Sequence, residues 1–465
     1  MKELLLLSGL GIAVLVLEII KQRKLILPLI VLGLLANIGL CIHDYSREEY
    51  VYGMLFFDQT EHLFTILISA VGIAWFLMAR NYLDKVSHIS DYSSLILFSM
   101  VGSVILVSYI NMTMLFLGIE ILSIPVYVMA GSDKRNIASN EASFKYFLMG
   151  AFASSFLLLG IAFLYGATGS FNITAIPKIL AMSRGVGFEL VLLGILLILF
   201  ALSFKVAAVP FHFWSPDVYV GSPTPVTAYM ATIVKISALI AFFRLFWDAF
   251  FILFPVYGVY ILLIALLTIV TGNILAVSQS NVKRMLAFSG IGHAGFVLLG
   301  MAIQKINIIQ SEVQYAEQSI IYYIVAYAFT GIAAFWVVNI VTANGNEEVN
   351  AFNGLVKRNP VLAGTLTLAL LSMAGIPPVS GFFAKYFILF NAIRGGNIWA
   401  AVIAILASLV GVYYYFRLII AIFFRTSENN DKIRVDWITT ISLLILCLLI
   451  LGLGLYPDFI FSIVK

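Results

Sequence analysis

The chain has few charged residues and almost no cysteine. Only 11% of its 465 residues are Asp, Glu, Lys or Arg, whereas 62% are hydrophobic. A soluble domain carries about 25% charged residues. The mean hydropathy of +1.05 predicts an integral membrane protein from end to end and argues against a soluble domain with a membrane anchor. The net charge of +4 is small and indicates no nucleic-acid partner.

The two cysteines, Cys41 and Cys447, lie far apart in hydrophobic surroundings. Neither belongs to a CxxC or other metal-ligand spacing, so the sequence predicts neither an iron–sulfur cluster nor a zinc site. No GxGxxG motif is followed by an acidic residue in a βαβ context, which argues against a nicotinamide or flavin site. We therefore expect no metal and no cofactor in this chain, and we expect any electron transfer to take place in other subunits.

Runs of about 18–25 apolar residues are candidates for membrane-spanning helices. We predict fourteen, at approximately 3–20, 25–42, 60–79, 91–108, 111–130, 141–166, 187–209, 223–246, 252–277, 284–303, 319–342, 359–393, 398–424 and 437–460. The first run lacks a small-residue cleavage site and the next run follows at once, so we interpret it as a helix and not as a signal peptide. The stretch 43–58 is too polar to span, and we expect a short external hairpin there.

Loop charges indicate the orientation, because Lys and Arg concentrate on the cytoplasmic side of a membrane. Every second connection is basic and holds Lys21, Arg23, Lys24, Arg80, Lys85, Lys134, Arg135, Lys283, Arg284, Lys357, Arg358, Arg425, Lys432 and Arg434. The opposite connections hold only Arg47, Lys178, Arg184, Arg244, Lys305 and Arg394. This bias predicts that both termini lie outside. The loop 210–222 has no Lys or Arg, and we interpret it as a re-entrant or amphipathic segment.

Five ionisable side chains lie inside the hydrophobic runs, namely Glu120, Lys145, Lys205, Lys235 and Lys385. A charge at mid-membrane costs roughly 2.5–3.5 kcal/mol, so five cost on the order of 15 kcal/mol if unpaired. These groups must therefore face a protein interior or a hydrated cavity. Ionisable residues placed in this way are typical of a proton or ion path.

Two of the runs contain prolines that should break their helices. Pro210 follows Lys205, and Pro377 and Pro378 lie about two turns before Lys385. Free backbone groups at membrane depth are tolerated only where they line protein or a hydrated cavity. Interrupted helices at matching places in two halves are typical of a transport site.

Weak internal similarity predicts a repeat, since MLFLGIEILSIPVYVMAG at 114–131 parallels MLAFSGIGHAGFVLLGMA at 285–302. Five helices per repeat, an odd number, would invert the second repeat in the membrane. We predict an all-α polytopic membrane protein of about fourteen transmembrane helices, with two inverted five-helix repeats that each contain a broken helix. The expected divisions are an N-terminal three-helix segment at 1–90, repeats at 91–247 and 252–424, and a C-terminal helix at 425–465.

Three motifs point to a known family: GIEILSIPVYVMAG from 118, FKVAAVPFHFWSPDVYVGSPTPVTAYMATIVK from 204, and AGIPPVSGFFAKYFILFNAI from 374. They resemble the antiporter-like membrane subunits of respiratory complex I, the NADH–quinone oxidoreductase, over essentially the whole chain. The resemblance implies a proton-translocating membrane-arm subunit without a redox centre of its own, driven by quinone reduction elsewhere in the complex. It also implies that FMN and iron–sulfur clusters belong to partner subunits, and that the other membrane-arm and peripheral-arm subunits and the lipid bilayer are the partners.

The resemblance further implies roles for individual residues. Glu120 matches a glutamate that pairs with the lysine at Lys205, Lys235 matches the lysine at the centre of the membrane path, and Lys385 matches the lysine near the second half-channel. The alternatives are structural: an ion pair of Glu120 with Lys205, or Lys235 and Lys385 bonded only to backbone carbonyls. A nearby carboxylate stabilises a charged lysine and burial opposes the charge, so the pair could also be adjustable.

Lys145 and His293 match further family positions and are secondary candidates. Lys145 lies near a predicted helix end and could extend to the membrane surface. His293 could relay protons between lysines, or it could be an interior histidine with satisfied hydrogen bonds. We expect His212, Trp214 and Asp217 to pack the interior-side loop, and most Phe and Tyr side chains to face lipid or form interface belts.

Three other functions remain open: a subunit of a multisubunit sodium/proton antiporter, a subunit of a membrane-bound hydrogenase complex, and a scaffold whose lysines only pair. The GIEILSIPVY motif and the lysine in the broken twelfth helix favour complex I over the first two. We expect the chain in the inner membrane of a bacterium.

Overall fold

The computed structural model is mainly helical, and its internal contacts divide it into two units. It describes residues 1–84, 88–182, 187–302, 310–426 and 431–464. The first unit comprises Met1–Ala207 and Gly221–Tyr257, and the second comprises Ala208–Val220 and Gly258–Lys465. Three of the loop cations counted above lie outside the described residues, namely Lys85, Arg184 and Lys305.

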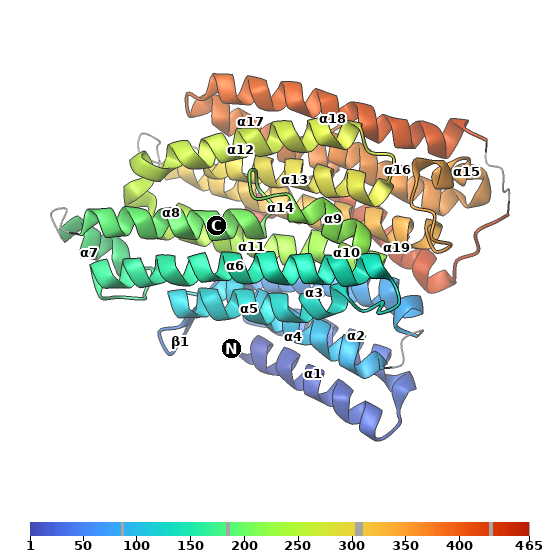
Figure 1. Cartoon of the computed structure of the whole chain (residues 1–465), viewed down its shortest axis with the longest axis horizontal. Helices are drawn as coiled ribbons and strands as arrows, with labels where there is room; N and C mark the ends of the chain where they lie inside the picture. The colour runs from blue at the N-terminus through green and yellow to red at the C-terminus, as the bar shows by residue number, and fades with distance from the viewer. Residues whose placement is uncertain (85–87, 183–186, 303–309, 427–430, 465) are drawn as a thin grey trace. The chain divides into compact units, whose positions relative to one another are not determined.

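The first unit (blue to green in Figure 1) is built from long helices joined by short turns. Its helices and strands are α1 Lys2–Ile19, η1 Arg23–Leu25, α2 Ile26–His43, β1 Glu49–Val51, β2 Leu55–Phe57, α3 Gln59–Leu83, α4 Ile89–Ser108, α5 Met112–Ala130, α6 Ile137–Thr168, α7 Ile176–Met182, α8 Phe188–Lys205, α10 Thr224–Tyr229, η2 Met230–Val234, α11 Lys235–Phe243, η3 Arg244–Ala249 and η4 Phe251–Leu253. In this unit α6 packs on α8, α4 on α5 and α1, and α2 on α3.

The second unit continues the helical pattern (yellow to red in Figure 1) and also includes most of one short helix from earlier in the chain. Its helices are α9 Trp214–Gly221, most of α12 Phe254–Val277, α13 Val282–Met301, α14 Gln310–Val341, η5 Val349–Phe352, α15 Leu355–Arg358, α16 Pro360–Ala374, α17 Ser380–Arg394, α18 Ile398–Phe424, α19 Trp437–Leu455 and α20 Asp458–Ile463. Within it α14 packs on both α16 and α17, and α16 packs on α18 and α19.

Side-chain caps set several helix starts. The Asp58 carboxylate accepts from the backbone N–H groups of Thr60 and Glu61, and Glu61 returns a bond to the Asp58 backbone, which is a capping box. The Asn136 side chain caps α6 at the Ala138 N–H. This cap starts α6 at Ile137 and not at the predicted 141, so Lys145 lies about a turn deeper in its helix than expected.

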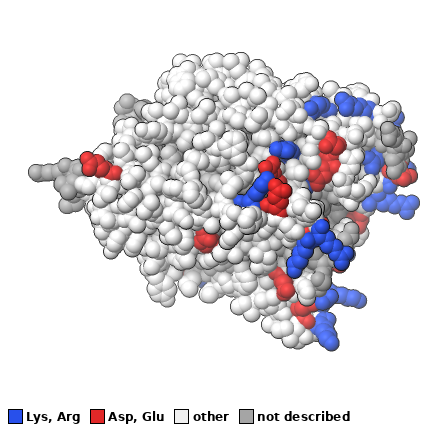
Figure 2. Space-filling view, viewed as in Figure 1, with Lys and Arg blue, Asp and Glu red and all other residues white. Residues whose placement is uncertain are grey.

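Twelve helical segments in the described part of the chain are long and apolar enough to cross a membrane. The segment of α1 and the broken segment of α16 and α17 are not among them, so the predicted number of fourteen is not confirmed. Figure 2 shows that residues other than Lys, Arg, Asp and Glu make up most of the face that it draws. Large apolar side chains such as Phe152 on α6 and Leu409 on α18 are exposed, as lipid-facing side chains are.

The irregular segments agree with the sequence. Strands β1 and β2 pair in antiparallel register, with Glu49 opposite Phe57, which confirms a hairpin within 43–58. The predicted breaks are also present: α8 ends at Lys205, and α16 ends at Ala374 before α17 starts at Ser380. Each break lies in the fourth helix of a predicted five-helix repeat.

Candidate functional site

Lys205 is buried at the last position of α8, with 5% of its surface exposed. Its ammonium donates a hydrogen bond to the Ser123 hydroxyl of α5, and the rings of Tyr127 and Tyr146 lie 5.6 Å away from its Nζ atom. The hydroxyl and the two aromatic faces partly replace the hydration that the ammonium loses. The sequence predicted the lysine but not these three partners.

Glu120 lies one turn before Ser123 on the same helix, because residues three apart share a face. Its Oε1 atom accepts a hydrogen bond from the Ser154 hydroxyl of α6 at 2.5 Å. The carboxylate and the ammonium of Lys205 therefore each bind a serine hydroxyl, while their opposite charges still attract through space. The structure brings Glu120 and Lys205 into one site, and each side chain is hydrogen-bonded to a serine hydroxyl.

A small pocket adjoins this pair. It is lined by Ser154 and Lys205 together with apolar and aromatic residues of α5, α6 and α8. Gly150 belongs to the lining, and a Cβ atom there would collide with the Tyr127 hydroxyl. The absent side chain at Gly150 therefore leaves room for the ring that covers Lys205.

Lys235 is 3% exposed and is the first residue of α11. It directly follows the π-helical segment η2, within a span, Thr224–Trp247, whose apolar window is wholly buried. Single π-helical turns inside α-helices occur frequently at functional sites. The structure therefore places Lys235 inside the protein, and its depth in the membrane stays a prediction.

Lys385 lies on the second turn of α17, after the helix break. Its ammonium donates to the backbone oxygen of Ala374 at 3.0 Å and to the Ser408 hydroxyl at 2.9 Å, and its Nζ atom lies 5.4 Å from the Phe296 ring centre. Ala374 is the last residue of α16, where carbonyl groups lack helical partners and carry partial negative charge. The broken helix thus supplies an acceptor for the lysine.

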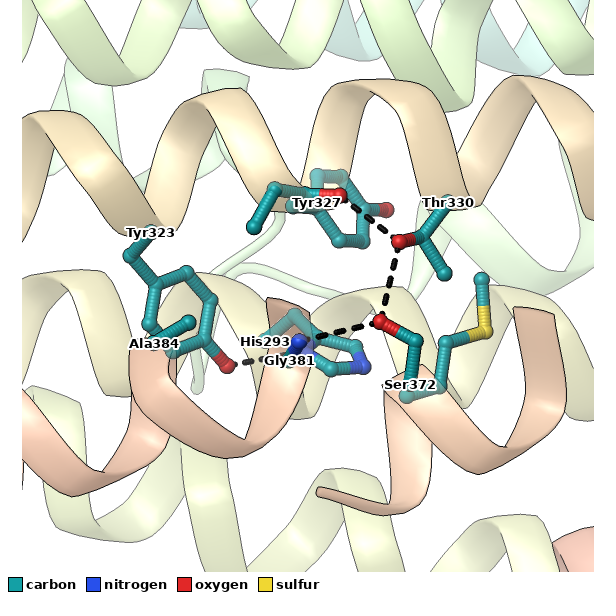
Figure 3. Close-up of a pocket in the computed structure, with 9 residues that line it drawn as sticks. His293, Tyr323, Tyr327, Thr330, Ser372, Gly381 and Ala384 are labelled. Carbon is teal, nitrogen blue, oxygen red and sulfur yellow. Dashed lines mark hydrogen bonds between the residues drawn. The ribbon is translucent and has the colours of Figure 1, made fainter. Parts of the chain in front are cut away.

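His293 on α13 lies among hydroxyl groups of the second unit (Figure 3). Its Nδ1 atom is 2.7 Å from the Tyr323 hydroxyl, and its Nε2 atom is 3.3 Å from the Tyr415 hydroxyl. The Tyr415 hydroxyl in turn is 2.5 Å from that of Ser289. In a neutral imidazole one ring nitrogen donates and the other accepts, so the ring can take up a proton at one nitrogen and release one from the other.

A second run of polar groups lines the same pocket, across the break between α16 and α17 (Figure 3). The Thr330 and Ser372 hydroxyls lie 3.1 Å apart, and the Gly381 N–H donates to the Ser372 oxygen at 3.0 Å. Backbone freed by the break is therefore satisfied by a serine side chain, as the membrane interior requires.

Lys145 has different surroundings from the other lysines. Its side chain is 40% exposed, and its ammonium forms an ion pair with Glu141 at 2.6 Å, one turn earlier on α6. Pairs at this spacing are common on exposed helix faces. A role in proton transfer for Lys145 stays a prediction, and its neighbour Tyr146 is the residue that reaches Lys205.

Most of the loop after α8 belongs to the second unit. His212 and Trp214 are buried, and Asp217 pairs with Arg284 at 3.1 Å. Two further ion pairs, each with one buried member, were not predicted. Arg244 pairs with Glu61, and Lys283, which is 2% exposed, binds Glu347 at 2.8 Å.

The prediction that most aromatic side chains face lipid or the membrane interface is wrong for the site tyrosines. Tyr127, Tyr146, Tyr323, Tyr327 and Tyr415 are all buried. Hydropathy alone does not separate a lipid-facing tyrosine from one that packs on a charge. Spacing could have identified Ser123, since it shares a helix face with Glu120.

Comparisons with known proteins agree with the sequence motifs. The family described as NADH:quinone oxidoreductase/Mrp antiporter, TM, matches residues 109–411. The chain is 42% identical to NADH-quinone oxidoreductase subunit N of Cytophaga hutchinsonii, over 100% of this chain and 99% of the relative. It is 41% identical to the subunit of the same name from Flavobacterium psychrophilum, over 100% of both.

Solved structures have the same fold. A chain of respiratory complex I from Thermus thermophilus, solved with bound aureothin, superposes with a TM-score of 0.85 at 29% identity, over 99% of this chain and 98% of the other. A chain of the Mrp complex from Dietzia superposes with a TM-score of 0.86 at 20% identity, over 99% and 95% of the two chains. From its motifs, its fold and its full-length relatives, the chain belongs to the NADH:quinone oxidoreductase/Mrp antiporter membrane family.

Proposed function

We propose that this chain is the N subunit of a bacterial NADH–quinone oxidoreductase and that it moves protons across the inner membrane. The full-length relatives carry that subunit's name. The observation that carries the proton role is the burial of Lys205 and Lys235, at 5% and 3% exposure, in helical segments long and apolar enough to cross a membrane. A buried lysine gains and loses a proton readily, which suits it to proton transfer.

In this proposal, protons arrive from the cytoplasmic side at Lys205 and Lys235. Glu120 stabilises the positive charge on Lys205, and the Ser123 and Ser154 hydroxyls hold the two groups in place. Charges interact strongly in a low-dielectric interior. A change in the distance between the carboxylate and the ammonium therefore changes how strongly Lys205 holds its proton.

The second half of the path uses His293 and Lys385. Both tyrosine hydroxyls beside His293 can pass a proton along, and the Phe296 ring beneath Lys385 belongs to the same helix as His293. Protons would leave from Lys385 to the outer side. FMN and iron–sulfur clusters in partner subunits would carry the electrons, so this chain would contribute no redox step of its own.

One experiment with two readouts tests the proposal. The tagged chain is purified gently from its native membrane, co-purifying subunits are identified by mass spectrometry, and the complex is reconstituted into vesicles for proton pumping. We expect flavin- and iron–sulfur-bearing NADH dehydrogenase subunits in the native preparation. Small membrane subunits without any redox protein would instead assign the chain to a sodium/proton antiporter.

In the same assay, Lys235→Ala should stop pumping or reduce it at least tenfold, while NADH oxidation by an artificial acceptor continues. Lys178→Ala removes an exposed lysine of α7 and should leave pumping unchanged. An assembled, redox-active Lys235→Ala complex with undiminished pumping would show that the lysine is structural.

One observation favours the alternative that the chain belongs to a different membrane-bound respiratory complex. A chain of the membrane-bound sulfane sulfur reductase, described as an archaeal respiratory membrane complex, superposes with a TM-score of 0.86 at 26% identity, over 99% of this chain and 96% of the other. The bacterial relatives are more similar, at 41–42% identity. Co-purification of a hydrogenase-type subunit in place of an NADH dehydrogenase would favour this alternative.

A further inference from the structure

Three buried side chains from α1, α2 and α3 meet away from the lysine sites. Glu3 lies in the first turn of α1, Cys41 in the last turn of α2 and His62 in the first turn of α3. Their exposed fractions are 2%, 0% and 2%. One atom capable of binding a metal from each residue lies within 4.8 Å of the other two. A carboxylate, a thiol and an imidazole are thus gathered at one end of three consecutive helices.

The histidine in this cluster has an unused ring nitrogen. Its buried Nδ1 atom has no hydrogen-bond partner and lies 3.8 Å from Oε1 of Glu3, which is beyond hydrogen-bond distance. This buried nitrogen is therefore available as a ligand atom on the side of the ring that faces Glu3.

Nearby cations are already paired with other carboxylate oxygens. The Met1 amino group binds Oε2 of Glu3 at 2.9 Å, and Lys2 and Arg47 bind Asp44 at 2.7 and 3.0 Å. Oε1 of Glu3 lies on the side of His62 and is bound by no Lys, Arg or amino-terminal nitrogen among the described residues.

We propose that Glu3, Cys41 and His62 bind one divalent transition-metal ion, with Zn²⁺ the ion that best fits the donor set. Zn²⁺ accepts Cys, His and carboxylate ligands together, whereas Ca²⁺ and Mg²⁺ prefer oxygen ligands. A thiolate and a carboxylate supply two negative charges, which balance the ion in a buried site. The cysteine loses its proton on binding. Three protein ligands leave a fourth position for water, and the ion would fasten α1, α2 and α3 together.

The sequence predicted no metal because its two cysteines have no metal-ligand spacing. The ligands stand at positions 3, 41 and 62, one on each helix, and only the folded helices bring them together. This is a different case from a zinc finger, whose ligands lie a few residues apart along the chain.

Cobalt titration of the purified full-length chain in detergent tests the site, after the chain has been stripped with a chelator. Co²⁺ replaces Zn²⁺ in such sites, and a cobalt–thiolate bond produces a charge-transfer absorption band. We expect the band to saturate at one Co²⁺ per chain and to disappear when Zn²⁺ is added. Native chain without a saturable band would overturn the proposal, whatever the variants do.

Variants identify the ligands. Cys41→Ser should abolish the charge-transfer band, and Glu3→Gln and His62→Gln should each weaken Co²⁺ binding at least about tenfold. Cys447→Ser, which removes the other free cysteine, should bind as the native chain does. Persistence of the band in Cys41→Ser would overturn the assignment. Thermal unfolding of each metal-free variant distinguishes a lost ligand from a misfolded chain. Zn²⁺ should raise the unfolding temperature of the native chain, because an ion that binds only the folded state stabilises it.

Discussion

At the residue scale, two lysines of this chain, Lys205 and Lys385, are each bound by a serine hydroxyl and lie beside an aromatic ring. Lys205 donates to Ser123 and Lys385 donates to Ser408, and each ammonium also lies near an aromatic ring. The lysines could be identified from the sequence, because a charged residue in an apolar run is rare. It did not reveal the serines, because Ser is common in membrane helices and a single hydroxyl has no distinctive spacing.

The hydroxyl that binds Glu120 gives a prediction at this scale. Ser154→Ala removes a hydrogen bond to a carboxylate, which contributes about 1.5–3 kcal/mol. Because 1.4 kcal/mol corresponds to about a tenfold change in rate, pumping in reconstituted vesicles should fall about tenfold or more.

Ser155 provides the matched control for this variant. It is the next residue on α6, is exposed, and donates only to the Ala151 backbone of its own helix. Ser155→Ala should pump at the native rate. Equal rates for the two alanine variants would mean that Ser154 does not hold the carboxylate during turnover.

At the scale of helices, the sequence predicted the positions of the long segments well. The predicted 398–424 is α18 to the residue, and both proline breaks fall where they were expected. Apolar runs and prolines act locally, so one sequence is sufficient to locate them. The π-helical segments η2 and η3 were not predicted, because they depend on packing with neighbouring helices and have no simple sequence pattern.

Close contact between α6 and α8 depends on two glycines. A Cβ atom at Gly160 would lie 2.8 Å from the Gly194 oxygen, and one at Gly194 would lie 2.9 Å from the Gly160 oxygen. Small residues permit such approach between membrane helices. Gly160→Ala should therefore lower the free energy of unfolding by about 1–3 kcal/mol, measured by thermal unfolding in detergent.

Gly166 lies on the same helix and tests whether the effect is specific to the contact. Nothing lies within 4 Å of a Cβ atom at this position. Gly166→Ala should be neutral or stabilise the helix by about 0.5–1 kcal/mol. If both variants lost the same stability, helix packing at Gly160 would not be the cause.

The turn that ends α16 gives a second prediction at this scale. Gly375 has φ of 82°, a left-handed conformation that costs other residues about 1–2 kcal/mol. A Cβ atom there would also lie 2.9 Å from the Lys385 side chain. Gly375→Ala should reduce both stability in detergent and proton pumping.

Gly364 on α16 is the control for Gly375, since a Cβ atom there has open space and its φ is helical. Gly364→Ala should keep native pumping and at least native stability. Native pumping in Gly375→Ala would mean that the geometry of this turn does not position Lys385.

At the scale of the whole chain, the predicted repeats and the observed units divide the sequence differently. The predicted boundary falls between 247 and 252, and the observed one falls between Tyr257 and Gly258. The segment Ala208–Val220 belongs to the second unit, because Val209 donates to Thr268 and Lys283 donates to the Val220 carbonyl. Contacts of this kind, between segments far apart in sequence, carry no local signal and could not be predicted.

Orientation in the membrane remains a prediction from loop charge, and cysteine labelling tests it. Tyr52 in the hairpin is 89% exposed and Ile137 at the start of α6 is 82% exposed. With a membrane-impermeant maleimide on spheroplasts, Tyr52→Cys should react directly and Ile137→Cys only after permeabilisation. The opposite pattern would place the termini in the cytoplasm. The native chain is the blank, because Cys41 is buried and Cys447 is partly buried.

The carbonyl that binds Lys385 differs in kind from the carboxylate beside Lys205. A carboxylate can take up a proton and so cancel its own attraction for a lysine, whereas a backbone carbonyl at a helix end has a permanent dipole. The attraction at Lys205 thus depends on a side chain, Glu120, whereas the negative potential that Ala374 offers to Lys385 comes from the backbone and is constant. Lys205 therefore has an adjustable counter-charge, whereas Lys385 has a fixed one. Any signal that alters the charge of Lys385 has to come from movement of α16 against α17 or from a charge elsewhere.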